Sequence, residues 1–101
     1  MPHYAIYCTD AADGTALRTQ NMPAHREHIA RIMPKIMLAG PCPALEGHSR
    51  EASLLVVEAD DAAAARQLLE SDPFYKVGVW EKIEIRRFNA LAGAWAPKPV
   101  R

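Results

Sequence analysis

The sequence predicts an α+β fold whose elements follow the ferredoxin-like order β-α-β-β-α-β. Three observations support it: four short runs of strand-forming residues, two helical segments between them, and Gly/Pro clusters at the joints. A chain of 101 residues has room for one core. We therefore expect one domain over residues 1–90 and a tail over residues 91–101.

The first half of the chain supplies a strand, a helix and a second strand. Residues 3–8 are rich in strand formers, and the polar cluster after them offers helix caps. Residues 15–33 have helical periodicity, so Pro23 either kinks this helix or begins a second one. Residues 35–39 predict a strand that ends at a stiff Gly-Pro loop over 40–43.

The second half supplies a strand, a helix and a last strand. Residues 52–59 are apolar on both faces and predict a strand. Two aspartates cap a helix over 62–71, which ends at Asp72-Pro73-Phe74. Residues 75–79 predict a tight turn, and 81–88 alternate as a strand.

The composition limits the classes of partner. Lysine plus arginine number 12, as do aspartate plus glutamate, which argues against a nucleic-acid surface. No stretch approaches the ~20 apolar residues of a membrane span. The start of the chain shows no secretion signal, so we expect a cytoplasmic protein.

The strand over 52–59 also predicts a homodimer. Two helices can cover only one face of a four-stranded antiparallel sheet, yet this strand is apolar on both faces. A monomer would leave a large apolar patch in water, which soluble proteins avoid. We therefore expect a second copy to pack sheet against sheet, in a dimeric α+β barrel.

His25 and Asp72 are candidate acid/base residues. They place an imidazole and a carboxylate at the ends of two different helices, and imidazole exchanges protons near neutral pH. The apolar residues Ile29, Ile32 and Met33 follow His25 at helical spacing, so His25 shares a buried stripe. The plainer alternatives are a core histidine bonded to a carbonyl and an aspartate that ends a helix.

Cofactor and metal signals are weak. His25 and His28 could share a metal, but further ligands would have to come from His3, His48 or the two cysteines, at no recognised spacing. We therefore expect no metal, and His28 at the helix edge. Neither a nucleotide fingerprint nor a haem attachment motif is present, so we expect no cofactor.

Cys8 and Cys42 make no disulfide framework. We expect two free thiols in a reducing compartment, with a reactive Cys42 beside the site as the alternative. Tyr4, Tyr7, Phe74 and Trp80 are expected in the core or a pocket wall, whereas Trp95 lies in the tail.

Several short motifs share one order and spacing with a known family. They are His3-Tyr4-Ala5-Ile6-Tyr7, Leu17-Arg18, Pro23-Ala24-His25, Leu38-Ala39-Gly40-Pro41, Asp72-Pro73-Phe74 and Gly78-Val79-Trp80-Glu81. Over about residues 2–90 the chain resembles the YCII-related (YciI-like) family, whose fold is similar to that of muconolactone isomerase.

The resemblance implies a site beside the sheet. His25 and Asp72 fall on the family's proposed histidine–aspartate pair, and Ser53 on a small polar position near the pocket. Relatives often carry arginine where this chain has Met22, so Arg18 becomes the expected anion contact. Phe74 is expected to border the substrate.

The implied function is cofactor-independent proton transfer of the lyase or isomerase type. One branch of the family, the chlorohydroxyhydroquinone dehydrochlorinases, eliminates HCl from a chlorinated ring, and this is the specific chemistry that we expect. The alternative is a non-catalytic dimer that binds a small molecule.

Overall fold

The computed structural model describes residues 1–46 and 50–96, and its elements confirm the ferredoxin-like order. None of the described helices is long and apolar enough to cross a membrane. The elements are β1 (His3–Asp10), α1 (Gly14–Ile32), the 3₁₀ turn η1 (Met33–Lys35), β2 (Ile36–Cys42), β3 (Ala52–Glu58), α2 (Ala62–Glu70), α3 (Pro73–Lys76) and β4 (Trp80–Phe88).

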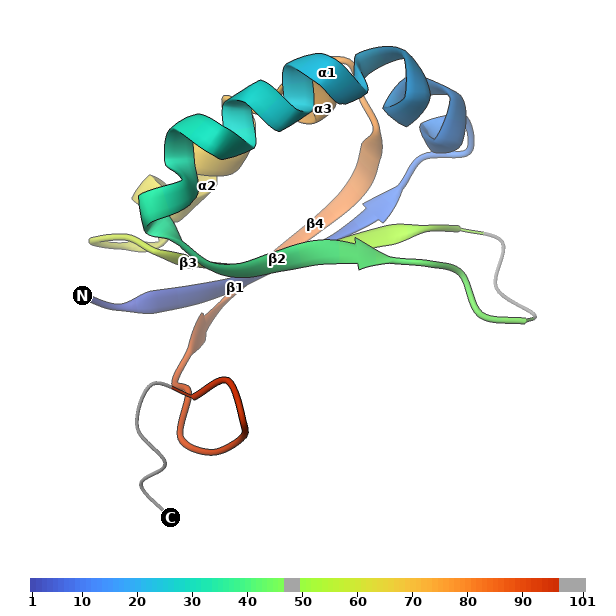
Figure 1. Cartoon of the computed structure of the whole chain (residues 1–101). Helices are drawn as coiled ribbons and strands as arrows, with labels where there is room; N and C mark the ends of the chain where they lie inside the picture. Colours follow the sequence, from blue (N-terminus) through green and yellow to red (C-terminus); the bar gives the residue numbers. More distant parts are fainter. Residues whose placement is uncertain (47–49, 97–101) are drawn as a thin grey trace.

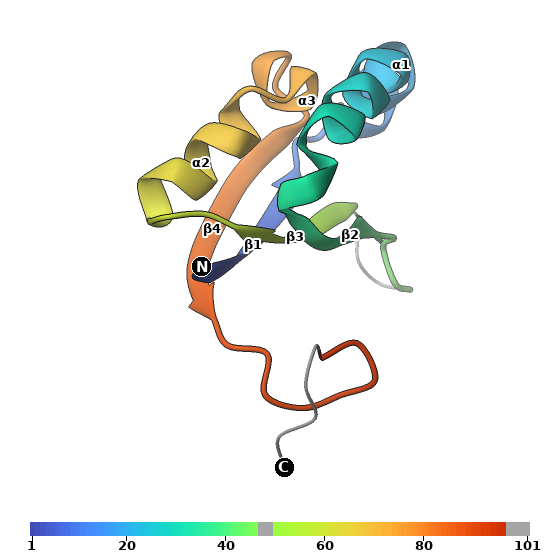
Figure 2. The same ribbon diagram turned by 60° about the vertical axis from the view of Figure 1, so that its left-hand side comes forward.

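The strands form one antiparallel sheet in the order β2-β3-β1-β4. The helices all lie over one face of this sheet, with α1 beside α2 and α3 (Figures 1 and 2). Alternate residues of β1 point to that face, and Tyr4, Ile6 and Cys8 are at most 8% exposed. The core therefore lies between the sheet and the helices.

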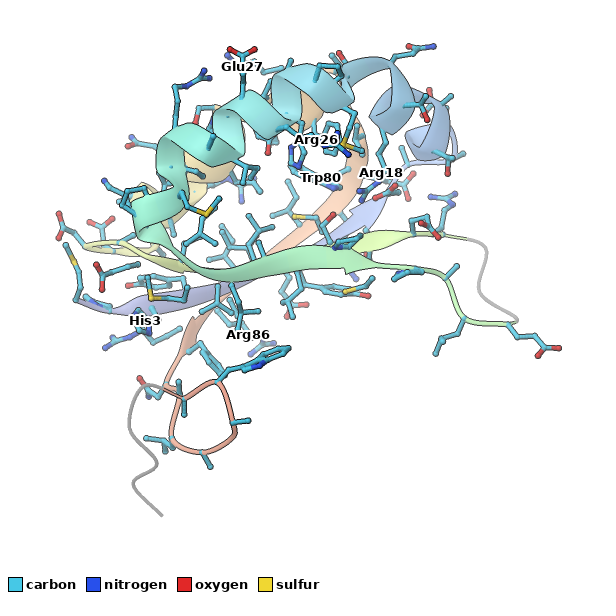
Figure 3. The ribbon with its side chains drawn as sticks, in the orientation of Figure 1. His3, Arg18, Arg26, Glu27, Trp80 and Arg86 are labelled. Atoms are coloured by element: carbon cyan, nitrogen blue, oxygen red, sulfur yellow. The ribbon has the colours of Figure 1, made fainter. Side chains whose placement is uncertain are left out.

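The opposite face of the sheet is covered by no helix of the described chain (Figure 2). On it β1 places Ala5, which pairs with Val56 of β3, and Tyr7, which is 46% exposed. Figure 3 shows His3 and Arg86 on this side of the sheet. The homodimer predicted from the apolar character of β3 stays a prediction.

The strand β2 is longer than the sequence predicted. We expected it to end at residue 39, before a Gly-Pro loop, but it continues through Gly40 and Pro41 to Cys42. Pro41 has no N–H to donate, and sheets tolerate proline where a strand lies at the edge, as β2 does. The loop prediction for 40–43 was therefore wrong.

The helix α1 is continuous over Gly14–Ile32 and includes Pro23. This finding excludes a second helix beginning at Pro23 and leaves the kink, because proline removes one backbone hydrogen bond. The ribbon of α1 changes direction in its first half (Figure 1).

Asp72 begins a helix rather than simply ending one. Its side chain accepts a hydrogen bond from the backbone N–H of Phe74 (2.9 Å), and Pro73 occupies the first helical position of α3. The tight turn predicted over 75–79 is therefore helical in its first part. Gly78, with φ of 83°, then reverses the chain into β4.

The chain after β4 crosses below the uncovered face of the sheet (Figure 1). Within the described part of this tail, Trp95 is 83% exposed. Pro97 and Pro99, the two prolines of the predicted tail, lie outside the described residues.

Candidate functional site

A cavity of about 650 Å³ lies between α1 and the strands β2 and β3. Its α1 residues come from successive turns of the helix and lie on one side of it. Figure 3 shows Arg18, Arg26 and Trp80 around the space between α1 and the sheet. The lining includes Arg18, Met22, His25, Arg26 and Ile29 of α1, Met33 of η1, Ala39, Gly40 and Pro41 of β2, Ser53 and Leu55 of β3, and Phe74 and Trp80.

His25 and Asp72 meet at the wall of this cavity. The Nδ1 atom of His25 lies 2.9 Å from each carboxylate oxygen of Asp72, although 47 positions separate the two residues. The Asp72 side chain is 2% exposed and that of His25 is 20% exposed. The structure therefore buries the carboxylate and leaves the imidazole accessible.

The contact fixes which nitrogen of neutral His25 carries the proton. A carboxylate only accepts hydrogen bonds, so Nδ1 must be the N–H donor to Asp72. Among the described residues, Nε2 has no hydrogen-bond partner. This nitrogen therefore has a free lone pair in the neutral ring and is suited to remove a proton.

Arg18 is held by a second buried carboxylate. Its Nε donates to Asp10 Oδ2 (2.6 Å), and its Nη2 donates to Asp10 Oδ1 (2.7 Å) and to Ser53 Oγ (2.8 Å). The hydrogen bond that Arg18 donates to Asp10, together with the charge of Asp10, raises the pKa of Arg18 above its ordinary value, against the effect of burial. The structure thus joins the predicted residues Arg18 and Ser53.

Sequence analysis missed Asp10 as part of the site. The residue is 1% exposed, and it was interpreted as one of several possible helix caps. A signal was available, because Asp10 continues the alternation of Tyr4, Ile6 and Cys8 on the buried face of β1. A charged residue at such a position requires a partner.

Phe74 lies between His25 and Arg18 and contacts both. Its ring stacks on His25 with centroids 3.8 Å apart and planes 3° from parallel, and Arg18 Cζ lies 5.4 Å from its centroid. The ring is 1% exposed. Phe74 therefore fixes the plane of the imidazole, and it belongs to the cavity lining.

His28 is buried rather than at the helix edge, so that prediction was wrong. It is 3% exposed, and its Nε2 donates to the carbonyl oxygen of Leu68 in α2 (3.1 Å). His3 lies 3.6 Å from Glu58, and His48 lies outside the described residues. Within residues 1–46 and 50–96, no group of three or more His, Cys, Asp or Glu side chains could hold a metal.

Both described cysteines are free thiols and lie outside the cavity lining. Cys8 is fully buried, and burial raises its pKa to about 12. Cys42 is partly exposed at the end of β2.

Known proteins resemble the chain over most of its length. The YciI proteins of Escherichia coli and Shigella flexneri are each 29% identical over 95 residues, covering 87% of this chain and 97% of theirs. A solved structure of 5-chloro-2-hydroxyhydroquinone dehydrochlorinase (TftG) from Burkholderia phenoliruptrix, in complex with 2,5-dihydroxybenzoquinone, has a TM-score of 0.77. It is 24% identical, covering 86% of this chain and 93% of that one, and it shows the shared fold.

The family is established by a separate match. The YCII-related domain matches residues 2–89, which include every residue placed above at the cavity and at the two buried carboxylates. The chain therefore belongs to the YCII-related family.

Proposed function

We propose that the protein is a cofactor-independent proton-transfer enzyme of the lyase or isomerase type, with His25 as its base. The observation that carries the proposal is the contact between His25 and the buried Asp72. It leaves the basic Nε2 of His25 at a cavity whose walls are largely apolar, where a small cyclic or aromatic-derived substrate fits.

Two groups of residues have different roles: His25 with Asp72 transfers the proton, and Arg18 with Ser53 binds the substrate oxygen. Asp72 orients His25 and stabilises the imidazolium that forms when the ring takes a proton. In the second group, Arg18 Nη1 has no hydrogen-bond acceptor among residues 1–46 and 50–96. Ser53 keeps its hydroxyl proton because its oxygen accepts from Arg18. Both can donate to a substrate oxygen that gains negative charge.

The specific reaction that we propose is loss of HCl from a chlorinated hydroxyhydroquinone. His25 takes the proton from the hydroxyl beside the chlorine and returns it to the carbon that bears the chlorine, which gives a ketone. His25 then takes the proton from the hydroxyl para to that ketone. The electron pair shifts through the ring, and the carbon–chlorine bond breaks as chloride leaves.

This sequence is balanced without a cofactor. The products are a hydroxyquinone, one proton and chloride, and the electrons that reduce carbon–chlorine to chloride come from the ring itself. Arg18 and Ser53 donate hydrogen bonds to the phenolate oxygen that forms before each step. Preorganised donors in a site that partly excludes water stabilise such a charge strongly.

The proposed homodimer would use the uncovered face of the sheet, opposite the cavity. The support is the apolar centre of this face, formed by Ala5, Val56 and the half-exposed Tyr7. Because the cavity lies on the helix side, the dimer leaves His25 accessible within each copy.

The test is chloride release from 5-chloro-2-hydroxyhydroquinone under anaerobic conditions with a chelator present. His25→Asn should lower turnover by about 10²–10⁴-fold, the usual range for a lost acid/base group. His3→Asn is the matched control, because His3 lies on the opposite face of the sheet (Figure 3). A wild-type protein that binds the ring but releases no chloride would refute the dehydrochlorination and favour the binding module.

A further inference from the structure

Glu51 is a carboxylate of the cavity that the proposed reaction does not use. It comes directly before β3 and lines the same cavity as His25. Residues two apart in an extended chain point to the same face of a sheet, and Glu51 comes two positions before Ser53. Its backbone carbonyl accepts from the N–H of Asp10 (2.9 Å), which continues the pairing of β1 with β3. Glu51 therefore lies on the helix side of the sheet, beside Asp10.

The carboxylate of Glu51 is held through one of its two oxygens. Its Oε2 accepts from the backbone N–H of Ala44 (2.9 Å), a bond between the two ends of the connection from β2 to β3. Among residues 1–46 and 50–96, Oε1 has no hydrogen-bond donor, and Glu51 forms no ion pair. Both oxygens of a carboxylate are acceptors, so Oε1 can accept from a molecule in the cavity.

Arg18 supplies an unused donor near this unused acceptor. Its Nε and Nη2 are taken up by Asp10 and Ser53, whereas Nη1 has no acceptor in the described part of the chain. The hydrogen bond to Asp10 and the charge of Asp10 raise the pKa of Arg18 above its ordinary value, and the charge of Glu51 raises it further. The cavity therefore presents a cationic donor and an anionic acceptor on side chains that both adjoin Asp10.

We propose that Glu51 is a substrate-binding residue that accepts a hydrogen bond from a hydroxyl of the bound ring. This inference rests on the proposed function and assigns a residue to the hydroxyl that the reaction leaves unchanged. When chloride leaves, the ionised oxygen lies at Arg18 and Ser53, and the hydroxyl on the adjacent ring carbon donates to Glu51. Because a carboxylate only accepts, the group at this position must carry a proton.

The contact with Glu51 would orient the ring in the cavity. In 5-chloro-2-hydroxyhydroquinone the two oxygens on adjacent carbons lie on the side of the ring opposite the chlorine. With these oxygens at Arg18 and Glu51, the chlorinated carbon faces His25. The reverse orientation places chlorine, which carries no proton, against an acceptor. A neighbouring negative charge also disfavours ionisation of the hydroxyl at Glu51, so the ionised oxygen is the one at Arg18.

The test compares the binding of three rings that contain no chlorine. Hydroxyhydroquinone has the adjacent hydroxyl, hydroquinone lacks it, and 2-methoxyhydroquinone keeps the oxygen without its proton. In anaerobic calorimetry the wild type should bind hydroxyhydroquinone about tenfold more tightly than either of the others, as one hydrogen bond to a charged acceptor predicts.

Glu51→Gln should bind all three rings about equally. The amide oxygen can still accept from the N–H of Ala44, which turns an N–H group toward the ring in place of Oε1. Glu58→Gln is the matched control, because it removes the same charge from the same strand. Glu58 pairs with His3 on the uncovered face of the sheet, so this variant should keep the wild-type preference.

Three results would overturn the inference. They are a wild type that binds the three rings equally, a Glu51→Gln variant that keeps the tenfold preference, and binding of none of the rings. Chloride release from 5-chloro-2-hydroxyhydroquinone separates the inference from the proposed function. Turnover by a wild type without the preference refutes the inference alone. A preference that is lost in Glu51→Gln, in a protein that releases no chloride, refutes the dehydrochlorination alone.

Discussion

Replacing Asp72 by asparagine should move the ring proton of neutral His25 from Nδ1 to Nε2 without unfolding the protein. Asparagine caps helices as well as aspartate does, so its oxygen can still accept from the N–H of Phe74. Its amide would then point an N–H at His25 Nδ1, where the carboxylate now accepts at 2.9 Å. Nδ1 would have to become the acceptor, and the proton would move to Nε2.

The predicted effect is large on catalysis and small on stability. In the variant the lone pair of His25 lies on Nδ1 and faces residue 72 instead of the cavity. Turnover should therefore fall by about 10²–10⁴-fold, equivalent to about 3–5 kcal/mol of activation free energy. Because the cap survives, the free energy of unfolding should change by less than about 1 kcal/mol. Ring ¹⁵N spectra report the tautomer, chloride release the turnover and urea titration the stability.

The matched control is Asp61→Asn. Asp61 caps α2 by accepting from the N–H of Ala64 (2.8 Å) and has no histidine partner among the described residues. This variant should keep full turnover. If Asp72→Asn keeps both the Nδ1–H tautomer and wild-type turnover, then the carboxylate does not set the proton on His25, and the proposed pair fails.

Four further predictions concern the rest of the chain. Asp10→Ala should lower the free energy of unfolding by about 3–5 kcal/mol in urea titration, because it leaves Arg18 buried without its partner; a loss below about 1 kcal/mol would contradict this. In the native protein a maleimide should label Cys42 and spare Cys8 until the chain is unfolded; equal labelling rates would show that β1 opens readily. Because burial raises the pKa of Cys8 from 9.0 to about 12, its contribution to stability is complete below pH 9.0 and should be lost as the pH rises toward 12. Tyr7→Lys should convert the proposed dimer to monomer in sedimentation, whereas a wild-type chain that is already monomeric would refute sheet-to-sheet packing.

The order of the elements could be predicted because it depends on local patterns. Alternation in the strands and helical spacing in α1 and α2 act over a few residues, and each is visible in the sequence. The C-terminal end of β2 was missed because the tolerance for Pro41 depends on β2 lying at the sheet edge. That position is a property of the whole sheet.

The site was partly predictable for a different reason. The pairing of His25 with Asp72 joins residues 47 positions apart. The residue types and their places at helix ends made both of them candidates, and the family resemblance placed them in one site. The partner of Arg18 was missed because Asp10 looked like one cap among several. The burial of His28 was missed because its acceptor, the Leu68 carbonyl, belongs to a helix whose packing no local pattern reveals.

The motif Asp72-Pro73-Phe74 shows how a local rule can serve a distant site. Pro73 begins α3, the cap bond fixes the Asp72 side chain, and the next residue is the ring that stacks on His25. One short helix therefore supplies both the hydrogen bond that sets the imidazole proton and the surface that sets the imidazole plane. Since the two constraints come from neighbouring residues, any shift of α3 would move them together. The direction of His25 Nε2 is thus coupled to the position of a four-residue helix rather than to α1 alone.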